Sequence, residues 1–187
     1  MISHTLPTLT PNAADKSGLH TEVIAKKSNR GARRRSRECV VQGLYTWLIN
    51  HERDSAALSA GSSGVIEAYL SDFDEFSHCD IDLFKQLLQG VIENAIQLRG
   101  IFSKHIDRKP NELSPVEHSL LLLGTYELVF CLEMSLRVVI NEAVEVSKLY
   151  GGNDAYKYVN GVLDKVAGSV RPVEFAQNKA AKLTKRS

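Results

Sequence analysis

A cluster of arginines is the feature of this sequence with the clearest chemical meaning. Four of them lie within five positions, directly before the amphipathic stretch ECVVQGLYTW: Arg33, Arg34, Arg35 and Arg37. Guanidinium groups form two-point hydrogen bonds with phosphate oxygens, so this density of arginines suits the backbone of RNA or DNA. The cluster therefore predicts a site for a nucleic acid.

Helix electrostatics support this interpretation. We expect the arginines at the first turn of a helix over about Arg34 to Ile49, where the helix dipole disfavours each cation by a few tenths of a kcal/mol to about 1 kcal/mol. The unpaired amides of that turn attract an anion as well. A helix selected only for stability would carry Asp or Glu there, so the cluster indicates binding.

Tyr45 is the aromatic residue best placed to extend this site. It lies two to three turns beyond the arginines, and stacking of an unpaired base on such a ring contributes about 1 to 3 kcal/mol. Other interpretations stay open. The arginines could form a solvated arm or pair with the acidic residues of SDFDEF. Tyr45 could equally pack in the core beside Leu44 and Leu48.

The residues that could serve catalysis or metal binding do not occur at the spacings that known catalytic or metal-binding motifs require. The six histidines lack HExxH and zinc-site spacing, and Cys39, Cys79 and Cys131 are far apart and odd in number. No glycine-rich phosphate loop, GxSxG motif or dinucleotide fingerprint occurs. We therefore expect no metal, no cofactor and no catalytic site, and predict that the protein is not an enzyme.

Composition limits the remaining classes. The 187 residues have 43% hydrophobic content and a net charge of only +1, so any signal for a polyanionic partner must be local. No stretch approaches the roughly 18 apolar residues of a membrane span, and the first 30 residues lack the apolar segment of a secretory signal. We expect a cytoplasmic protein with no membrane contact and with either one sizeable core or two small cores that share an interface.

The elements that position these residues are predicted to be helices. Apolar residues recur at steps of three and four along most of the chain, which is typical of an all-α protein with about six or seven helices. After the first helix, the linker DSAALSAGSSG should precede a short helix over 65–76. Later helices are expected over about 81–106, 115–130, 137–150 and 155–170.

Several helix ends carry capping signals. Asp80 is expected to cap the helix that follows it. Ser114 and Glu117 flank Pro115 in a capping-box pattern, with Ser at the N-cap and Glu three positions later. The glycines at 151–152 suit a left-handed C-cap, and Asn153 or Asp154 should cap the next helix. Residues 1–31 are expected to form a disordered leader and 173–187 a flexible basic tail.

Three segments then resemble a known family. RRRSRECVVQGLYTW resembles the amino-terminal helix of the NusB family, and the stretch from Val138 to Pro172 is similar to that family's INEAxELAK and FVNGVLD motifs. SPVEHSLLLLGTYEL lies between them, so the similarity spans about Ala32 to Pro172. Departures are modest: Ser36 and Gly43 stand where alanine is usual, and the leader is long.

The resemblance implies a fold and a function. The fold would be two three-helix bundles packed across each other in an RNA-binding domain over 32–172. The function would be transcription antitermination without catalysis. In that role the protein binds boxA RNA of nascent ribosomal RNA leaders together with NusE, a small-subunit ribosomal protein, within an RNA polymerase antitermination complex.

The resemblance also assigns site residues. Glu117 matches a position that faces the protein partner, although its capping role already explains it. Asp154 is expected to cap its helix and present Lys157, and Asn160 to bond backbone inside the bundle. The residues that match RNA-contacting positions of the family are Arg33, Arg34, Arg35, Arg37, Tyr45, Asp154, Lys157 and Asn160.

Alternatives of other classes remain. NusB-like domains also occur fused to RNA methyltransferases, but the fifteen residues after Pro172 are too few for a catalytic domain. A protein-interaction bundle with a solvated basic arm is a second alternative. A homodimer is a third, because an apolar patch that accepts a partner could also accept a second copy.

Overall fold

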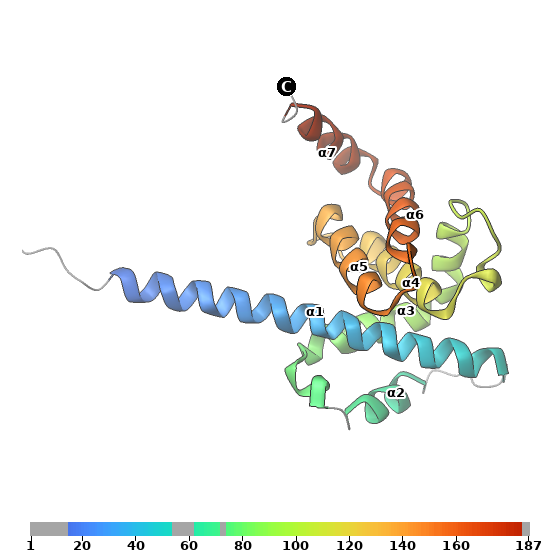
Figure 1. The fold of residues 1–187 in the computed structure, drawn as a ribbon, viewed down its shortest axis with the longest axis horizontal. Helices are drawn as coiled ribbons and strands as arrows, with labels where there is room; N and C mark the ends of the chain where they lie inside the picture. The colour runs from blue at the N-terminus through green and yellow to red at the C-terminus, as the bar shows by residue number, and fades with distance from the viewer. Residues whose placement is uncertain (1–14, 54–61, 72–73, 185–187) are drawn as a thin grey trace, which may run out of the picture.

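The computed structural model describes residues 15–53, 62–71 and 74–184, and Figure 1 shows their arrangement. These ranges contain seven α-helices, two short 3₁₀ helices and no strand, as the sequence predicted. The 3₁₀ helices η2 and η3 cover Asp74–His78 and Pro110–Glu112. The α-helices are α1 (Asp15–Arg53), α2 (Ser62–Ser71), α3 (Ile81–Phe102), α4 (Pro115–Phe130), α5 (Leu136–Tyr150), α6 (Ala155–Val170) and α7 (Pro172–Thr184).

Helix α4 is the centre of the molecule. Every residue from His118 to Leu128 is buried, because α4 packs against α1, α3, α5 and α6. Helices α1 to α3 form one bundle and α4 to α6 the other, and the two bundles cross (Figure 1). This confirms the predicted pair of three-helix bundles. The burial of each large apolar side chain in the shared core contributes about 1.5 to 3 kcal/mol.

The predicted caps of α3 and α4 are present. The carboxylate of Asp80 accepts a hydrogen bond from the amide of Leu83 at 3.1 Å. At α4 the amide of Glu117 donates to Ser114 Oγ at 3.2 Å, and the amide of Ser114 donates to Glu117 Oε2 at 3.1 Å. Helix α3 ends at Phe102, one turn before the predicted end, because the amide of His105 bonds to the carbonyl of Phe102 and tightens the chain.

The first helix begins much earlier than predicted. Helix α1 begins at Asp15, so residues 15–31 are helical where a disordered leader was expected. This segment holds only three large apolar residues, Leu19, Val23 and Ile24, so it gave no sustained periodic signal. The arginines at 33–37 consequently lie in the interior of α1. The argument from the helix dipole was wrong for them.

Two further boundaries differ. Helix α2 begins at Ser62, within the segment predicted as a linker, whose residues 54–61 lie outside the described ranges. The expected flexible tail forms α7, in which the ring of Phe175 lies against Gly168 and Glu174 accepts a hydrogen bond from the amide of Leu136 at 2.9 Å. Contacts with α5 and α6 therefore hold α7 in place, although its own sequence predicted no packing partner for it.

Candidate nucleic-acid interface

Arg37 differs from the other three arginines because the fold uses it. Its side chain is only 4% exposed, and its Nη2 and Nε atoms donate to Glu127 Oε1 on α4 at 2.7 and 3.0 Å. Burial raises the pKa of Glu127, and the nearby guanidinium opposes that rise. The prediction that all four guanidinium groups are free of the fold was therefore wrong at Arg37.

The other three arginines remain on the surface, each beside one carboxylate. Arg34 donates from Nε and Nη2 to the two oxygens of Glu142 on α5, both at 3.0 Å. This hydrogen-bonded pair raises the pKa of Arg34. Arg35 lies 2.6 Å from Glu38. The side chains of Arg33, Arg34 and Arg35 are 53%, 40% and 42% exposed, so a phosphate can reach all three.

Tyr45 lies on the same face of α1 as Arg34. Eleven residues separate them, which is three turns plus about 20°, or ~16 Å along the helix axis. Tyr45 is 41% exposed, whereas its neighbours Leu44 and Leu48 are buried. The structure thus decides the open question about this residue, because the ring is accessible for stacking and is not part of the core.

A second tyrosine, not singled out by the sequence analysis, borders the same surface. The hydroxyl of Tyr150, at the end of α5, accepts a hydrogen bond from Gln42 Nε2 on α1 at 3.1 Å. Tyr150 is 38% exposed, and burial of its hydroxyl raises its pKa. In the sequence, Tyr150 is marked only by its position directly before two glycines. The packing of α5 on α1 is what brings its ring near the arginines.

Lysines and a third tyrosine extend this surface onto α6. Lys148 Nζ and Lys157 Nζ both lie 5.8 Å from the centre of the Tyr156 ring. We call the whole surface the basic–aromatic face. It consists of Arg33, Arg34, Arg35, Tyr45, Lys148, Tyr150, Tyr156 and Lys157.

The turn between α5 and α6 departs from the expected capping. Gly151 has φ −81°, so it is not a left-handed C-cap, and Asp154 has φ 65°. Asp154 occupies the N-cap position of α6, but its side chain makes no capping hydrogen bond. Its carboxylate lies 2.7 Å from Lys157 Nζ instead. The residue therefore neutralises the lysine that it was expected only to position.

Asn160 lies at the border of this face, one turn of α6 beyond Lys157, and Glu117 lies away from it. Asn160 is exposed and borders a cavity, so the expected internal hydrogen bond is wrong. Glu117 lies in the first turn of α4, where the amide and the hydroxyl of Ser114 both donate to its carboxylate. The structure brings together the surface arginines, Tyr45 and the start of α6, and leaves Glu117 at a separate place.

None of the described histidines, cysteines and carboxylates form a group of three or more that could hold a metal ion. Among the described helices, none has the length and apolar character needed to cross a membrane.

The fold and this face define a class of protein, namely all-α proteins of two crossed three-helix bundles with a basic and aromatic surface. The model of the NusB family matches residues 34–168. A relative from Cupriavidus pinatubonensis, named transcription antitermination protein NusB, is 46% identical over 94% of this chain and 98% of its own length. One from Bordetella pertussis with the same name is 47% identical over 80% of this chain and 94% of its own. The chain belongs to the NusB family.

Solved structures give the same fold. A T. maritima NusB structure superimposes with a TM-score of 0.62 at 28% identity, covering 77% of this chain and 96% of that one. A structure of NusB and NusE in complex with double-stranded RNA gives a TM-score of 0.58 at 22% identity, covering 73% and 96%. The predicted family and fold are therefore confirmed.

Proposed function

We propose that this protein is a transcription antitermination factor that binds boxA RNA of nascent ribosomal RNA leaders through its basic–aromatic face. The observation that carries the proposal is the placement of three exposed guanidinium groups on the same surface as two exposed tyrosines. Relatives named as antitermination proteins at 46 to 47% identity support it. The described residues contribute binding groups, and the proposed role requires no catalysis.

A phosphate would replace Glu142 at Arg34 and bind beside Glu38 at Arg35. Glu142 and Glu38 orient the guanidinium groups of Arg34 and Arg35 while the face is empty. A partly exposed ion pair such as Arg34–Glu142 contributes only about 0 to 1 kcal/mol, so its exchange for a charge-assisted bond to phosphate costs little. The side chain of Glu38 is only 6% exposed, so it stays paired with Arg35, whose other N–H donors remain for the phosphate. Tyr45 and Tyr150 then offer rings on which unpaired bases stack.

The proposed partner is NusE, the small-subunit ribosomal protein. A NusB structure of the same fold was solved in complex with NusE and RNA, which motivates this assignment. Glu117 is our candidate contact for the partner. We place the resulting complex in the cytoplasm, within an antitermination assembly on RNA polymerase, and we regard a homodimer as a competing state of the free protein.

The test is RNA binding by the purified full chain, alone and with NusE, to boxA RNA and to a scrambled RNA of the same composition. The paired variant Arg34→Gln with Arg35→Gln should weaken binding at least about tenfold, since each lost phosphate contact removes favourable counterion release. Lys104→Gln on the exposed surface is the control. Equal affinity of the paired variant and the wild type, or no preference for boxA, contradicts the proposal.

A further inference from the structure

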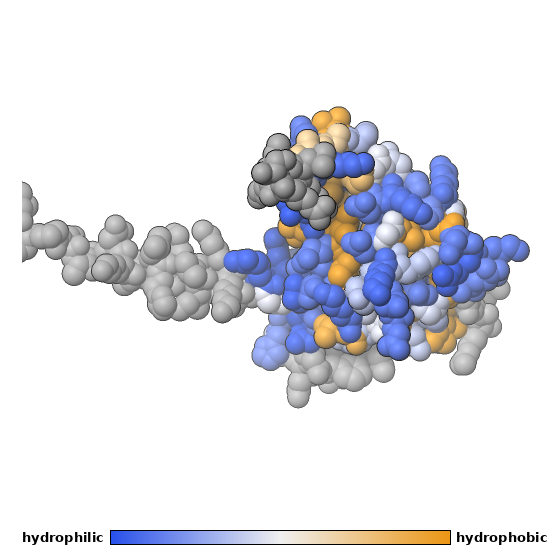
Figure 2. Space-filling model, turned by 45° about the horizontal axis from the view of Figure 1, so that its top comes forward, coloured by the Kyte–Doolittle hydropathy of each residue, from blue (hydrophilic) through white to orange (hydrophobic). Residues whose placement is uncertain are grey.

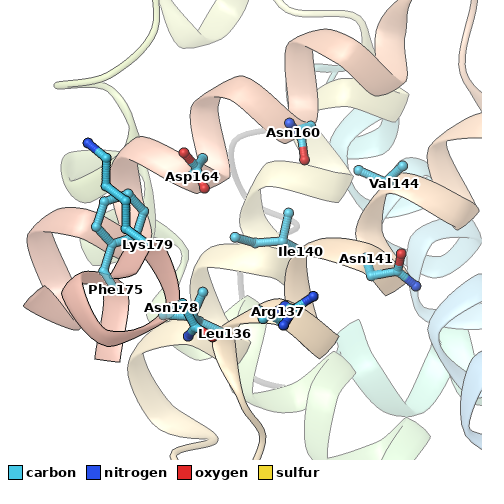
Figure 3. A pocket seen from close by; sticks show the side chains of 10 residues that line it. All are labelled: Leu136, Arg137, Ile140, Asn141, Val144, Asn160, Asp164, Phe175, Asn178 and Lys179. Carbon is cyan, nitrogen blue, oxygen red and sulfur yellow. The ribbon is translucent and has the colours of Figure 1, made fainter. Parts of the chain in front are cut away.

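A groove lies between α5, α6 and α7, outside the basic–aromatic face. It encloses about 500 Å³, and Figure 3 shows the side chains that line it. Its apolar lining comes from Ile140 and Val144 on α5 and from Phe175 on α7. On the face drawn in Figure 2, hydrophobic areas lie apart from one another within a largely hydrophilic surface. We call this feature the α5–α7 groove.

The rim of the groove carries polar groups that the fold leaves unused. Across the described part of the chain, five rim side chains make no hydrogen bond and no ion pair: Arg137, Asn141, Asn160, Asp164 and Lys179. Two of them are cations, one is a carboxylate and two are primary amides. Opposite charges stand around one cavity without pairing, so a bound molecule can still use each of them.

This set of groups matches a nucleotide. Arg137 and Lys179 suit a phosphate. The primary amides of Asn141 and Asn160 each offer a donor and an acceptor, which match the edge of a base. Asp164 accepts only, so it suits a base with an exocyclic amine, whereas the one donor of uracil, N3–H, is flanked by two carbonyl oxygens that repel a carboxylate. The volume admits one nucleotide, and the apolar lining covers its ring.

The groove is continuous with the basic–aromatic face along α6. Lys157, Asn160 and Asp164 follow one another at steps of three and four residues, so they lie on one stripe of the helix. This stripe is ~10 Å long. A strand that contacts Lys157 therefore passes Asn160 and reaches the groove without crossing another element.

We propose that the α5–α7 groove binds one unpaired nucleotide of the RNA, with preference for a base that carries an exocyclic amine. The inference rests on the proposed RNA-binding function. A peptide would also fit the amides and the apolar lining. RNA is favoured because the groove carries two cations against one carboxylate and because the stripe of α6 that begins at Lys157 leads into it.

The experiment measures fluorescence anisotropy of labelled 12-residue oligocytidine and oligouridine with the full-length protein. The wild type should bind oligocytidine about tenfold more tightly, since one correct base contact discriminates by about this factor. Asp164→Ala should abolish the preference, and the matched control Asp82→Ala, an exposed carboxylate on α3, should retain it. Arg137→Gln should weaken both oligonucleotides about threefold, and Lys104→Gln should weaken neither.

The outcomes separate the inference from the proposed function. Equal binding of both oligonucleotides, unchanged by Asp164→Ala, overturns the nucleotide site. If the paired Arg34 and Arg35 variant still weakens binding in that case, the proposed function stands. If Arg137→Gln leaves RNA binding intact and weakens binding of NusE, the groove is a protein site and the inference is wrong. Folding of each variant is checked by circular dichroism.

Discussion

At the scale of single residues, the four clustered arginines divide into two kinds. Arg37 serves the fold through a buried pair with Glu127, whereas Arg33, Arg34 and Arg35 lie on the surface beside carboxylates. Buried and exposed ion pairs differ in energy because removing one member of a buried pair leaves the other charged and without water. Substitution of Arg37 is therefore expected to affect mainly stability, and substitution of a surface arginine mainly RNA binding.

Arg37→Met is expected to lower the free energy of unfolding by about 3 to 5 kcal/mol, because Glu127 is left as an unpaired buried charge. Arg34→Gln should change it by less than about 1 kcal/mol. Urea denaturation of both variants measures the difference. The double variant Arg37→Met with Glu127→Leu should regain most of the loss and bind RNA within about twofold of the wild type. A large loss of RNA affinity in the folded double variant would show that Arg37 contacts RNA directly.

His118 makes stability depend on pH. Burial lowers its pKa to about 4, and Arg99 adds to this effect by donating from Nε to His118 Nε2 at 3.0 Å. The unfolded chain binds a proton near pH 6.5 and the folded chain only near pH 4, so stability falls as the pH drops through this window. The fall attributable to this group is at most about 3 kcal/mol.

The measurement is urea denaturation of the wild type and of His118→Gln between pH 7.5 and 4.5. Glutamine retains an acceptor for Arg99 but does not titrate in this range. The variant should therefore lose a smaller fraction of its stability on acidification. Parallel curves for the two proteins would mean that His118 contributes nothing to the acid sensitivity.

At the scale of elements, the turn between α5 and α6 sets the charge at one end of the basic–aromatic face. Asp154 adopts φ 65°, which Asn tolerates as well as Asp does, and its carboxylate is 2.7 Å from Lys157 Nζ. Asp154→Asn should keep the turn, free the lysine and remove a repulsive charge. We expect RNA affinity to rise about two- to fivefold at low salt, as measured by filter binding.

The gain depends on Lys157, which provides the control. In a Lys157→Gln background, Asp154→Asn should produce a smaller gain, because only the repulsion is removed. Weaker RNA binding by Asp154→Asn alone would show that the carboxylate itself is needed at the interface.

The first turn of α4 offers a test of the partner role of Glu117. Glu117→Gln keeps an acceptor for the amide of Ser114, so the capping box and stability should persist, while Ser114→Ala should cost about 1 kcal/mol. If Glu117 contacts NusE through its charge, only Glu117→Gln weakens the complex in calorimetry. Equal affinities of both variants and the wild type would restrict Glu117 to its structural role.

At the scale of the whole molecule, the net charge of +1 hides a polarised surface, so binding to RNA should depend steeply on salt. Each phosphate neutralised on a single strand contributes a slope of about 0.7 in log K against log salt. Replacing Arg33, Arg34 and Arg35 together by Gln should lower the slope by up to about 2. Any loss of stability in urea should come mainly from Arg35, because Glu38, whose side chain is 6% exposed, loses its partner.

Filter binding between 50 and 300 mM salt measures this slope. Lys104→Gln, at an exposed residue just after α3, should leave it unchanged. An identical slope for the triple variant and the wild type would remove the basic–aromatic face from the binding reaction.

Helices with strong local signals were predictable from the amino-acid sequence alone. The all-α class follows from the periodicity of apolar residues. The caps at Ser114 and Asp80 follow from side chains that accept a hydrogen bond from a backbone amide three residues later. Two long motifs in order indicated the family. The arginines and Tyr45 were also legible as candidates, because their chemistry does not depend on distant contacts.

Only the tertiary structure decided which candidates are free. Glu127 lies 90 positions from Arg37 and Glu142 lies 108 from Arg34, so no local pattern could assign these partners. Residues 15–31 became helix and 172–184 became α7 without a periodic apolar signal. The exposure of Tyr45, the place of Tyr150 and the α5–α7 groove all arise where helices far apart in sequence pack together, because burial and pairing are properties of the assembled bundles.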